Sequence, residues 1–383
     1  MAHNTMKSLI FQKAIWERLK KAFNTDRVGS AYLFAGPEGC GKEGMALQFA
    51  ALLNCTGSGE LPCRTCPSCR KFESLQHPNL KLIVPLPGGL KKGDTHGNPL
   101  DGLSSKDLDY LTQAMARKGA DPFYKIQVAR ARRILITSIR ELRRTIFLKS
   151  HEKGQKVVLI FDAHLLSEGQ GESGNALLKI LEEPPKNTTI ILVTDLKSGL
   201  LATILSRCQL INFPPLDNET VFSIIKQNGF NPEEADFAAG ISRGNVHRAL
   251  SLADKPKVEI ENLIRNLVDQ VINESYSWKS FIDSEALLAF RNPREFKFHF
   301  YLLQLWFHKA MLHKNGTVTE NAFSGLNDMF TDFNRSYPHA DLTAINGYLE
   351  GTIDSLTRNL YTPLTLTNLL LSIQDSIRGK NGL

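Results

Sequence analysis

The sequence predicts an α/β protein that begins with a parallel-sheet domain and ends in a bundle of helices. Residues 157–161 (VVLIF) form a continuous apolar run, which is typical of a strand covered on both faces. A helical segment (NALLKILEE) and a second apolar run (TIILVT, 189–194) follow, so the three segments predict a strand–helix–strand unit. Residues 256–383 instead contain one amphipathic helical segment after another, which predicts a bundle.

Length and composition are those of a globular protein with two or three domains. The 383 residues are 42% hydrophobic and 22% charged, which is ordinary for a soluble chain. A net charge of +7 is compatible with a polyanionic partner, although many soluble proteins share it. No uncharged apolar run reaches about 18 residues, and the N-terminus lacks a signal-peptide core. We therefore expect no membrane contact and a cytoplasmic location.

The N-terminal segment 9–23 predicts an amphipathic helix. Charged residues alternate there with apolar ones at helical spacing. The side chains expected on the buried face are Ile10, Ala14, Ile15, Leu19, Ala22 and Phe23.

A strand-type run, AYLFA (31–35), leads into GPEGCGKEG, which has the spacing of a phosphate-binding loop. Gly36, Gly39 and Gly41 would let backbone N–H groups surround phosphate oxygens, and Lys42 would reach further phosphates. A helix is expected to follow over 43–54.

Glu43 departs from the phosphate-loop pattern, because that position normally carries a Ser or Thr hydroxyl that ligates Mg²⁺. A carboxylate there can touch a metal ion, but it also repels phosphates. The residues leave two interpretations open: a site for ATP and Mg²⁺, and a structural turn that has retained its glycines.

Four cysteines within residues 55–69 predict a structural metal module. A CxxCxxC motif with one further cysteine upstream supplies four thiolate ligands for a tetrahedral Zn²⁺ site. The expected ligands are Cys55, Cys63, Cys66 and Cys69. We expect the nearby His77 to be a turn or packing residue rather than a fifth ligand. Cys40 and Cys208 are expected to be small residues in packed loops.

An insertion follows the strand predicted for LKLIVP (80–85) and covers residues 86–125. Its first part is rich in Gly, Pro and charge, which is typical of a surface loop, and 103–118 predict an added helix. Lys91 and Lys92 are candidates for DNA contact, but a solvated loop is the favoured interpretation. The residues themselves suggest no function for the insertion.

Residues 137–150 predict a basic helix capped by Thr137 or Ser138. Ile139, Leu142 and Ile146 form its expected buried face, with Arg140, Arg143 and Arg144 outside. Such a helix can meet phosphates non-specifically, but a solvated charged face is the simpler interpretation.

Asp162 and Thr194 end two of the predicted strands. Ligands of parallel sheets bind beyond the carboxyl ends of the strands, so both side chains are candidates for a site at that edge.

The stretch NALLKILEEPP followed by TILSRC resembles the AAA+ subunits of bacterial DNA polymerase III clamp loaders, gamma/tau and delta-prime, over about residues 11–250. The resemblance implies an AAA+ P-loop-type sheet domain over 1–215 that carries the zinc module. It further implies a small helical lid domain over 216–255 and a helical collar for oligomerisation over 256–383.

In this family an active site needs an Asp for Mg²⁺ and an adjacent Glu that orients the attacking water. Asp162 matches the Glu position if the following HLL is aligned, and then Phe161 replaces the Asp. If the acidic residue itself is aligned, Asp162 is the metal ligand and Ala163 replaces the Glu. Either way the resemblance implies that one carboxylate is missing, and neither replacement can bind a metal or polarise water.

The sensor motifs of the family are also incomplete. Thr194 matches the first sensor. The second sensor is an arginine that reaches the γ-phosphate, and His247 stands at its position. Arg248 lies one residue further on, and one step along a helix rotates a side chain by about 100°, so it would point elsewhere.

Arg207, within Ser206-Arg207-Cys208, matches the family's arginine finger, which reaches ATP bound to a neighbouring subunit. The resemblance thus implies a delta-prime-type subunit without efficient ATPase or polymerase activity of its own. It would assist ATP-driven loading of the sliding clamp onto primed DNA. The implied partners are delta and gamma/tau in a hetero-pentamer, the sliding clamp, and primer-template DNA contacted through its backbone.

Two alternatives remain at this point. One is a working ATPase of the gamma/tau type, in which Glu43 and the region of Asp162 would function abnormally. The other is a zinc-bearing DNA-binding protein unrelated to clamp loading.

Overall fold

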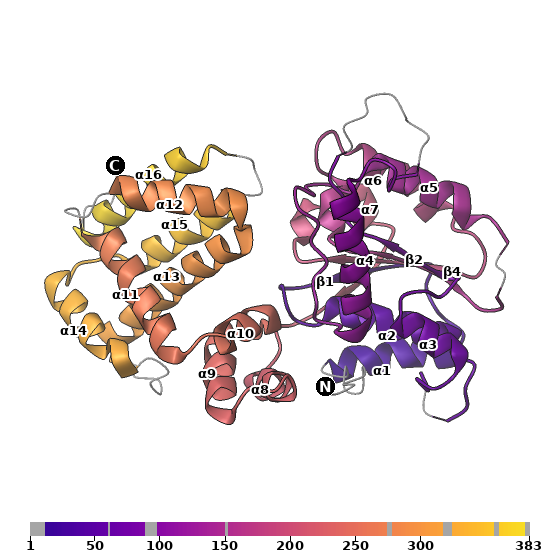
Figure 1. Cartoon of the computed structure of the whole chain (residues 1–383), viewed down its shortest axis with the longest axis horizontal. Coiled ribbons are helices and arrows are strands. Elements are labelled where there is room, and N and C mark those ends of the chain that lie inside the picture. The colour runs from indigo at the N-terminus through magenta and orange to yellow at the C-terminus, as the bar shows by residue number, and fades with distance from the viewer. Residues whose placement is uncertain are drawn as a thin grey trace. The chain divides into compact units, whose positions relative to one another are not determined.

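The computed structural model describes residues 12–59, 62–88, 98–149, 152–273, 278–316, 324–355 and 360–379. The chain divides into two compact units (Figure 1). The first comprises Met1–Val221 with Arg243–His247, and the second comprises Phe222–Ser242 with Arg248–Leu383. The predicted domain boundaries at residues 215 and 255 stay predictions. Ile10, Lys91 and Lys92, which the sequence singled out, lie outside the described residues.

One parallel sheet organises the first unit and confirms the predicted α/β class. Among the described residues it contains five strands in the order β2-β3-β4-β1-β5. They are β1 (Ala31–Ala35), β2 (Leu80–Ile83), β3 (Lys156–Ile160), β4 (Thr188–Thr194) and β5 (Gln209–Asn212). The four strands predicted from apolar runs are all present. In the register of the sheet Ala35 pairs with both Thr194 and Asn212, so the ends of β1, β4 and β5 lie together.

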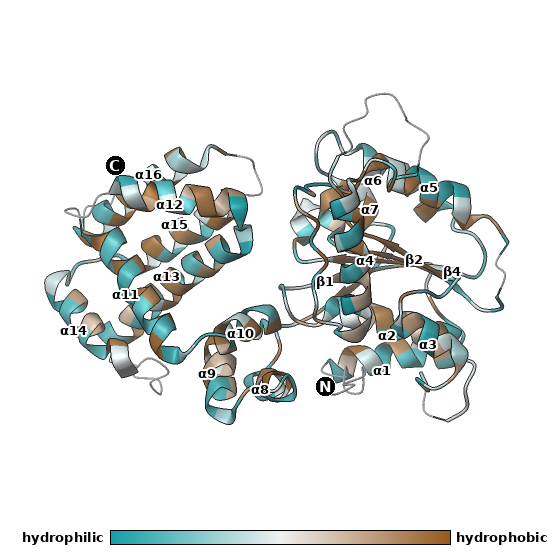
Figure 2. Ribbon diagram, viewed as in Figure 1, coloured by the Kyte–Doolittle hydropathy of each residue, from teal (hydrophilic) through white to brown (hydrophobic). Residues whose placement is uncertain are grey.

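Helices cover both faces of this sheet. On one face, apolar side chains of β1, β3 and β4 pack against α5, α6 and α7. On the other, Tyr32 of β1 meets Phe49 of α2 edge to face, with ring centroids 5.7 Å apart. Figure 2 shows that hydrophobic residues dominate the strands, as a sheet buried on both faces requires. The helices are α1 (Lys13–Asn24), α2 (Lys42–Asn54), α3 (Pro67–Glu73), α4 (Ser105–Ala120), α5 (Ile136–Ile146), α6 (Glu172–Glu182) and α7 (Ala202–Leu205).

The buried face of α1 differs from the prediction. Trp16 and Leu19 are its buried residues, whereas Ala14 is exposed. Gln12, directly before the helix, is also buried, and its side-chain amide donates to the carbonyl oxygens of Cys40 and Pro214. The face of α1 that packs against the protein is therefore the one that carries the large Trp16 side chain, and not the predicted face that includes Ala14.

The caps predicted for α5 are wrong. The N-cap is Leu135, without a side-chain cap, and Ser138 is buried in the first turn. Tertiary contacts fix the start of the helix, because the Ile134 N–H donates to the Leu165 carbonyl and the Ile134 carbonyl accepts from the Ser173 hydroxyl. The predicted buried face of Ile139, Leu142 and Ile146 is confirmed, and Arg140, Arg143 and Arg144 are exposed.

The remainder of the chain is helical in its described parts, as predicted. Its helices are α8 (Asn218–Gln227), α9 (Pro232–Ser242), α10 (Val246–Ala253), α11 (Lys257–Ile272), α12 (Trp278–Arg291), α13 (Pro293–Lys314), α14 (Asn327–Ser336), α15 (Leu342–Ser355) and α16 (Thr362–Ile377). Leu303, Trp306 and Phe307 of α13 are buried in the core of these helices. No helix among the described residues is both long enough and apolar enough to cross a bilayer.

Candidate functional site

The glycine-rich loop between β1 and α2 has the backbone of a phosphate-binding loop. Gly41 is the N-cap of α2 with a φ of 88°, a conformation that favours glycine. Gly39 is closely covered, since a Cβ there would lie 2.1 Å from Asn245 Oδ1. The Val246 N–H also donates to the Gly39 carbonyl oxygen over 3.1 Å. The segment 243–247 of the first unit is thus packed directly on the loop.

Lys42, the expected phosphate ligand, is folded back onto the protein. Its ammonium donates to the carbonyl oxygens of Gly36 and Pro37, over 2.9 and 2.6 Å. It also pairs with Asp195 Oδ1 at 2.6 Å, and the side chain is only 4% exposed. The charge that would meet a phosphate is therefore already neutralised by a carboxylate of this chain.

Lys125, from the end of the insertion, is the centre of the site. Its Nζ lies 2.6 Å from Asp162 Oδ1, 3.0 Å from Asp195 Oδ2 and 3.8 Å from Glu43 Oε1. Burial opposes its charge, but the surrounding carboxylates outweigh this and raise the pKa of Lys125 well above its ordinary value. Burial likewise opposes the charge of Asp195, yet Lys125 and Lys42 hold its pKa well below the usual range.

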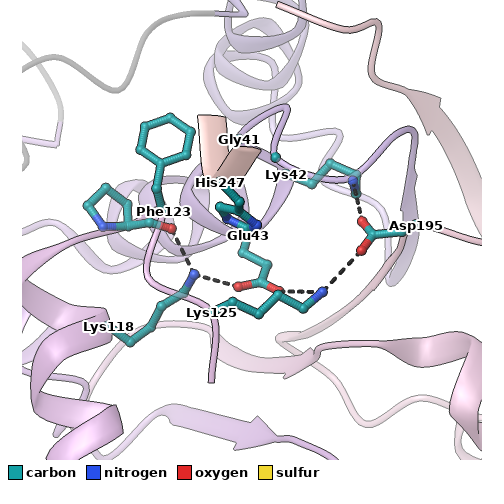
Figure 3. Close-up of a pocket in the computed structure, with 10 residues that line it drawn as sticks. Gly41, Lys42, Glu43, Lys118, Phe123, Lys125, Asp195 and His247 are labelled. Carbon is teal, nitrogen blue, oxygen red and sulfur yellow. Dashed lines mark hydrogen bonds and ion pairs between the residues drawn. The ribbon is translucent and has the colours of Figure 1, made fainter. Parts of the chain in front are cut away.

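Lys118 of α4 balances the charge of Glu43. Its buried ammonium forms an ion pair with Glu43 Oε2 and donates to the Pro122 carbonyl oxygen over 2.7 Å. It also lies 5.4 Å from the centre of the Phe161 ring. Although burial raises the pKa of Glu43, the nearby Lys118 and Lys125 lower it overall. Figure 3 shows the resulting chain of ion pairs, which runs from Lys118 through Glu43, Lys125 and Asp195 to Lys42.

His247, at the position of the second sensor, also lines this pocket. Its Nδ1 lies 3.5 Å from Glu38 Oε1, and this contact outweighs burial and lowers the pKa of Glu38 to about 2. Arg248 does point elsewhere, as expected. Its guanidinium lies 3.6 Å from the centre of the Tyr301 ring and donates to the Ser242 carbonyl oxygen.

The space left between these side chains is small. The cavity has a volume of about 20 Å³, far below the range of about 300–1,000 Å³ that is usual for ligand pockets. Phe123, from the insertion, narrows it further, because its ring lies within 3.7 Å of the place where a Gly41 Cβ would be. The pocket thus combines a glycine-rich loop with a cavity that leaves little room for a ligand.

The sequence predicted the edge of this site and the charged residues Lys42, Glu43 and Asp162, but not Lys118, Lys125 and Asp195. Thr194 turns out to be bound within the fold, because its hydroxyl lies 3.1 Å from His164 Nδ1 and accepts from the Leu196 N–H. Asp195, one residue further on, faces the pocket instead. Its position directly after a buried strand was a usable signal. Lys118 and Lys125 gave no such signal.

Breaking the Lys118–Glu43 pair should destabilise the chain strongly. In Lys118→Met the Glu43 carboxylate stays buried without its main partner, and we expect a loss of about 3–5 kcal/mol in the free energy of unfolding. Chemical unfolding of the full chain measures this loss. Lys20→Met, which removes an exposed pair with Glu17, is the matched control and should cost less than about 1 kcal/mol. Adding Glu43→Gln to Lys118→Met should recover much of the loss, and equal stability of Lys118→Met and Lys20→Met would contradict the assignment.

The predicted cysteine cluster is assembled in the structure. The sulfur atoms of Cys55, Cys63, Cys66 and Cys69 all lie within 4.8 Å of one another. Four thiolates at about 2.3 Å from a tetrahedral zinc ion would be about 3.8 Å apart, so a small contraction suffices. Gly57 permits this packing, since a Cβ there would lie 2.3 Å from the Cys63 sulfur.

Backbone N–H groups point at these sulfur atoms, as they do around metal-bound thiolates. The N–H groups of Cys63, Cys66 and Cys69 donate to the preceding cysteine of the motif over 3.3–3.4 Å. Burial opposes the thiolate of Cys66, but the Cys69 N–H and Thr56 lower its pKa to about 5. Burial raises the pKa of the Cys69 thiol, so a bound cation is needed to keep all four sulfur atoms ionised.

The other predictions around this module are confirmed. His77 is a packing residue, because its buried ring stacks on Phe72 and its Nε2 lies 3.0 Å from the Ser68 hydroxyl. Cys40 is buried, and Cys208 is partly buried against the core.

Arg207 lies just after α7, at the surface of the first unit. Its guanidinium lies 2.8 Å from Glu182 Oε1 and donates to the Thr203 carbonyl oxygen over 3.0 Å. The side chain is 35% exposed. The two stretches that carry the sequence resemblance, which contain Glu182 and Arg207, therefore meet through this ion pair.

Comparison with known proteins shows the family of this chain. Residues 11–217, more than half of the chain, match the family described as "DNA polymerase III, delta subunit". The chain belongs to this family. The resemblance read from the sequence is thereby confirmed.

Individual relatives are DNA polymerase III subunits of several kinds. The chain is 29% identical to subunit delta' of Bacillus subtilis over 244 residues, which cover 63% of this chain and 59% of the relative. It is 24% identical to subunit delta' of Haemophilus influenzae over 67% of this chain and 62% of the relative. It is 28% identical to subunit tau of Bacillus subtilis over 69% of this chain and 41% of that protein. The chain thus spans about three-fifths of the length of these delta' relatives.

Among solved structures, the chain is similar to a gamma subunit-related protein of Thermotoga maritima. The match covers 94% of this chain and 99% of that one, with 15% identity and a TM-score of 0.37.

Proposed function

We propose that this chain is a delta-prime-type subunit of a DNA polymerase III clamp loader, with an idle nucleotide site of its own and an arginine finger, Arg207, that serves a neighbouring subunit. Its proposed partners are gamma/tau and delta in a hetero-pentamer, the sliding clamp and primer-template DNA. The observation that carries the proposal is a contrast between two kinds of charge. The lysines of the pocket are all paired internally, whereas the Arg207 guanidinium lies at the surface, where an ion pair with Glu182 and hydrogen bonds to Thr203 and Ser206 hold it. A cytoplasmic location is part of this proposal.

The idle site follows from charge. A bound nucleotide triphosphate needs cationic groups and usually Mg²⁺. Each lysine of the pocket is already neutralised by a carboxylate of this chain. Lys42 pairs with Asp195, and Lys118 pairs with Glu43. Lys125 pairs with Asp162 and Asp195 and lies slightly farther from Glu43. A nucleotide would have to break these buried pairs, and each broken pair leaves an uncompensated charge.

The role of Arg207 follows from the small energy that holds it. An ion pair at the surface contributes about 0–1 kcal/mol, so the guanidinium can leave Glu182 at little cost. A guanidinium placed at a γ-phosphate stabilises the charge of the transition state. Arg207 would supply that group to ATP bound by the adjoining subunit.

Zinc is the metal proposed for the four cysteines. Four thiolates in a closed tetrahedral arrangement are a usual structural zinc site. The ion would hold the segment between α2 and α3, and its role would be structural rather than catalytic.

Two observations favour the gamma/tau-type alternative. The loop contains Gly36, Gly39, Gly41 and Lys42. The tau relative also matches a larger share of this chain than the first delta' relative does. Family membership argues against a zinc-bearing DNA-binding protein unrelated to clamp loading.

The purified chain is therefore expected to show neither ATP binding nor ATP hydrolysis. Equilibrium binding of a fluorescent ATP analogue and release of phosphate, each with Mg²⁺ present, measure the two properties. Turnover that requires metal and that Lys42→Ala abolishes would overturn the idle site and support the gamma/tau-type alternative.

A further inference from the structure

Three carboxylates from distant parts of the chain converge on one ammonium group. Glu43 comes from the first turn of α2, Asp162 follows β3, and Asp195 follows β4. Lys125, at the end of the insertion 86–125, brings its Nζ within 2.6–3.8 Å of an oxygen of each of them. Its side chain is only 8% exposed.

Such a set of oxygen atoms is what a hard divalent cation requires. Mg²⁺ and Ca²⁺ are bound in proteins by carboxylate oxygens, and Mg²⁺ in nucleotide sites lies beside the phosphate loop. Without a cation, three carboxylates this close together would repel one another strongly. In this chain the Lys125 ammonium lies where the three carboxylates converge, and its charge offsets their mutual repulsion.

We propose that Lys125 is a tethered substitute for a divalent metal ion. The insertion delivers the ammonium to the position where the three carboxylates meet, so the pocket excludes Mg²⁺ and any nucleotide that depends on it. This gives the insertion a function. It also accounts for Glu43, since a carboxylate at that position is stable when Lys118 pairs with one of its oxygens and Lys125 faces the other.

Two further features of the insertion support the same assignment. Phe123 lies against the phosphate loop at Gly41, so the insertion occupies space as well as supplying charge. Lys118, which lies near the end of α4 and within the same insertion, also reaches the pocket. The insertion thus replaces both the cation and part of the volume that a ligand would fill.

The inference predicts that removal of the ammonium creates a divalent cation site. In zinc-loaded Lys125→Met, Mn²⁺ is expected to bind at concentrations up to about 1 mM, the weak end of oxygen-ligand sites. Electron paramagnetic resonance of free Mn²⁺ measures binding directly, and the unaltered chain should take up at least about tenfold less. A triple variant that adds Asp162→Asn and Asp195→Asn to Lys125→Met should lose the gained Mn²⁺.

Lys125→Met removes the ion pair of Asp162 and one of the two lysine partners of Glu43 and of Asp195, which keep Lys118 and Lys42, so its fold is tested as well. If it unfolds without metal, Mn²⁺ should restore its native circular dichroism, and the polar variant Lys125→Gln should behave in the same way. A folded variant that binds no Mn²⁺, or variants that Mn²⁺ does not rescue, would overturn the inference. The inference would also be overturned if the unaltered chain bound Mn²⁺ and the Asp162→Asn variant did not.

This inference rests on the idle nucleotide site proposed above, but not on clamp loading. Mn²⁺ uptake is measured on the isolated chain without ATP. If Arg207 fails to act in an assembled complex, the inference about Lys125 is unaffected. If Lys125→Met fails to bind Mn²⁺, the proposed role of Arg207 is unaffected.

Discussion

Replacing Arg207 by alanine is expected to lower ATP hydrolysis at the adjoining subunit by about 10³-fold or more, the magnitude found for arginine fingers in other nucleotide hydrolases. The physical reason is that the guanidinium meets charge that develops on the γ-phosphate only in the transition state, so its loss affects the rate more than the binding of ATP. Arg207→Lys should recover little of the rate, because an ammonium lacks the planar, forked donors of a guanidinium.

The measurement needs a reconstituted complex in which only the site next to this chain can turn over, with the other nucleotide sites inactivated in their own phosphate loops. Single-turnover hydrolysis in the presence of primed DNA then reports on this site. Arg335→Ala removes another exposed, ion-paired arginine and serves as the control that should leave the rate unchanged. An Arg207→Ala complex that hydrolyses ATP as fast as the unaltered one would refute the finger role.

Cys63→Ser is expected to abolish zinc binding and to unfold the module around residues 55–69. Structural zinc sites of this type contribute about 10–16 kcal/mol of apparent binding free energy. Because a segment with a small core folds only when it binds the metal, this binding energy is what stabilises its fold. Zinc content after dialysis against a chelator, measured by atomic absorption, should fall below that of the unaltered chain. Cys208→Ser, outside the cluster, should retain its zinc.

The same variant discriminates between functions. A structural module predicts that Cys63→Ser impairs the fold near α2 and α3, since the Ser68 hydroxyl connects this region to the carbonyl of Asn54. Loss of DNA binding with normal folding and normal assembly would contradict a structural role and favour a DNA-binding function for the zinc module.

Patterns within short stretches predicted the strands of the sheet because a strand buried on both faces must be apolar throughout. β5 was missed for the same reason, since it lies at the edge of the sheet and two of its four residues are exposed. The cysteine module was predictable because its ligands lie close together in sequence. The start of α5 was not, because hydrogen bonds from distant segments determine it.

The charges of the pocket show where sequence reasoning ends. Glu43 was recognised as a departure from the phosphate-loop pattern, but its partner Lys118 lies 75 residues away. Lys125 is separated by 37 residues from Asp162 and by 70 from Asp195. No local periodicity connects such residues, so only the fold reveals that these charges neutralise one another.

The interlocked ion pairs also limit which single substitutions the pocket tolerates. A change of Glu43 to serine would complete the phosphate-loop motif but would leave Lys118 buried without its counter-charge, and loss of Lys118 alone would leave Glu43 without its main partner. Each single change is therefore less stable than the starting point, and only coordinated replacements in α2 and in the insertion avoid the penalty. Epistasis of this kind couples residues that lie far apart in the sequence, so the pocket tolerates substitution best when its charges are replaced together.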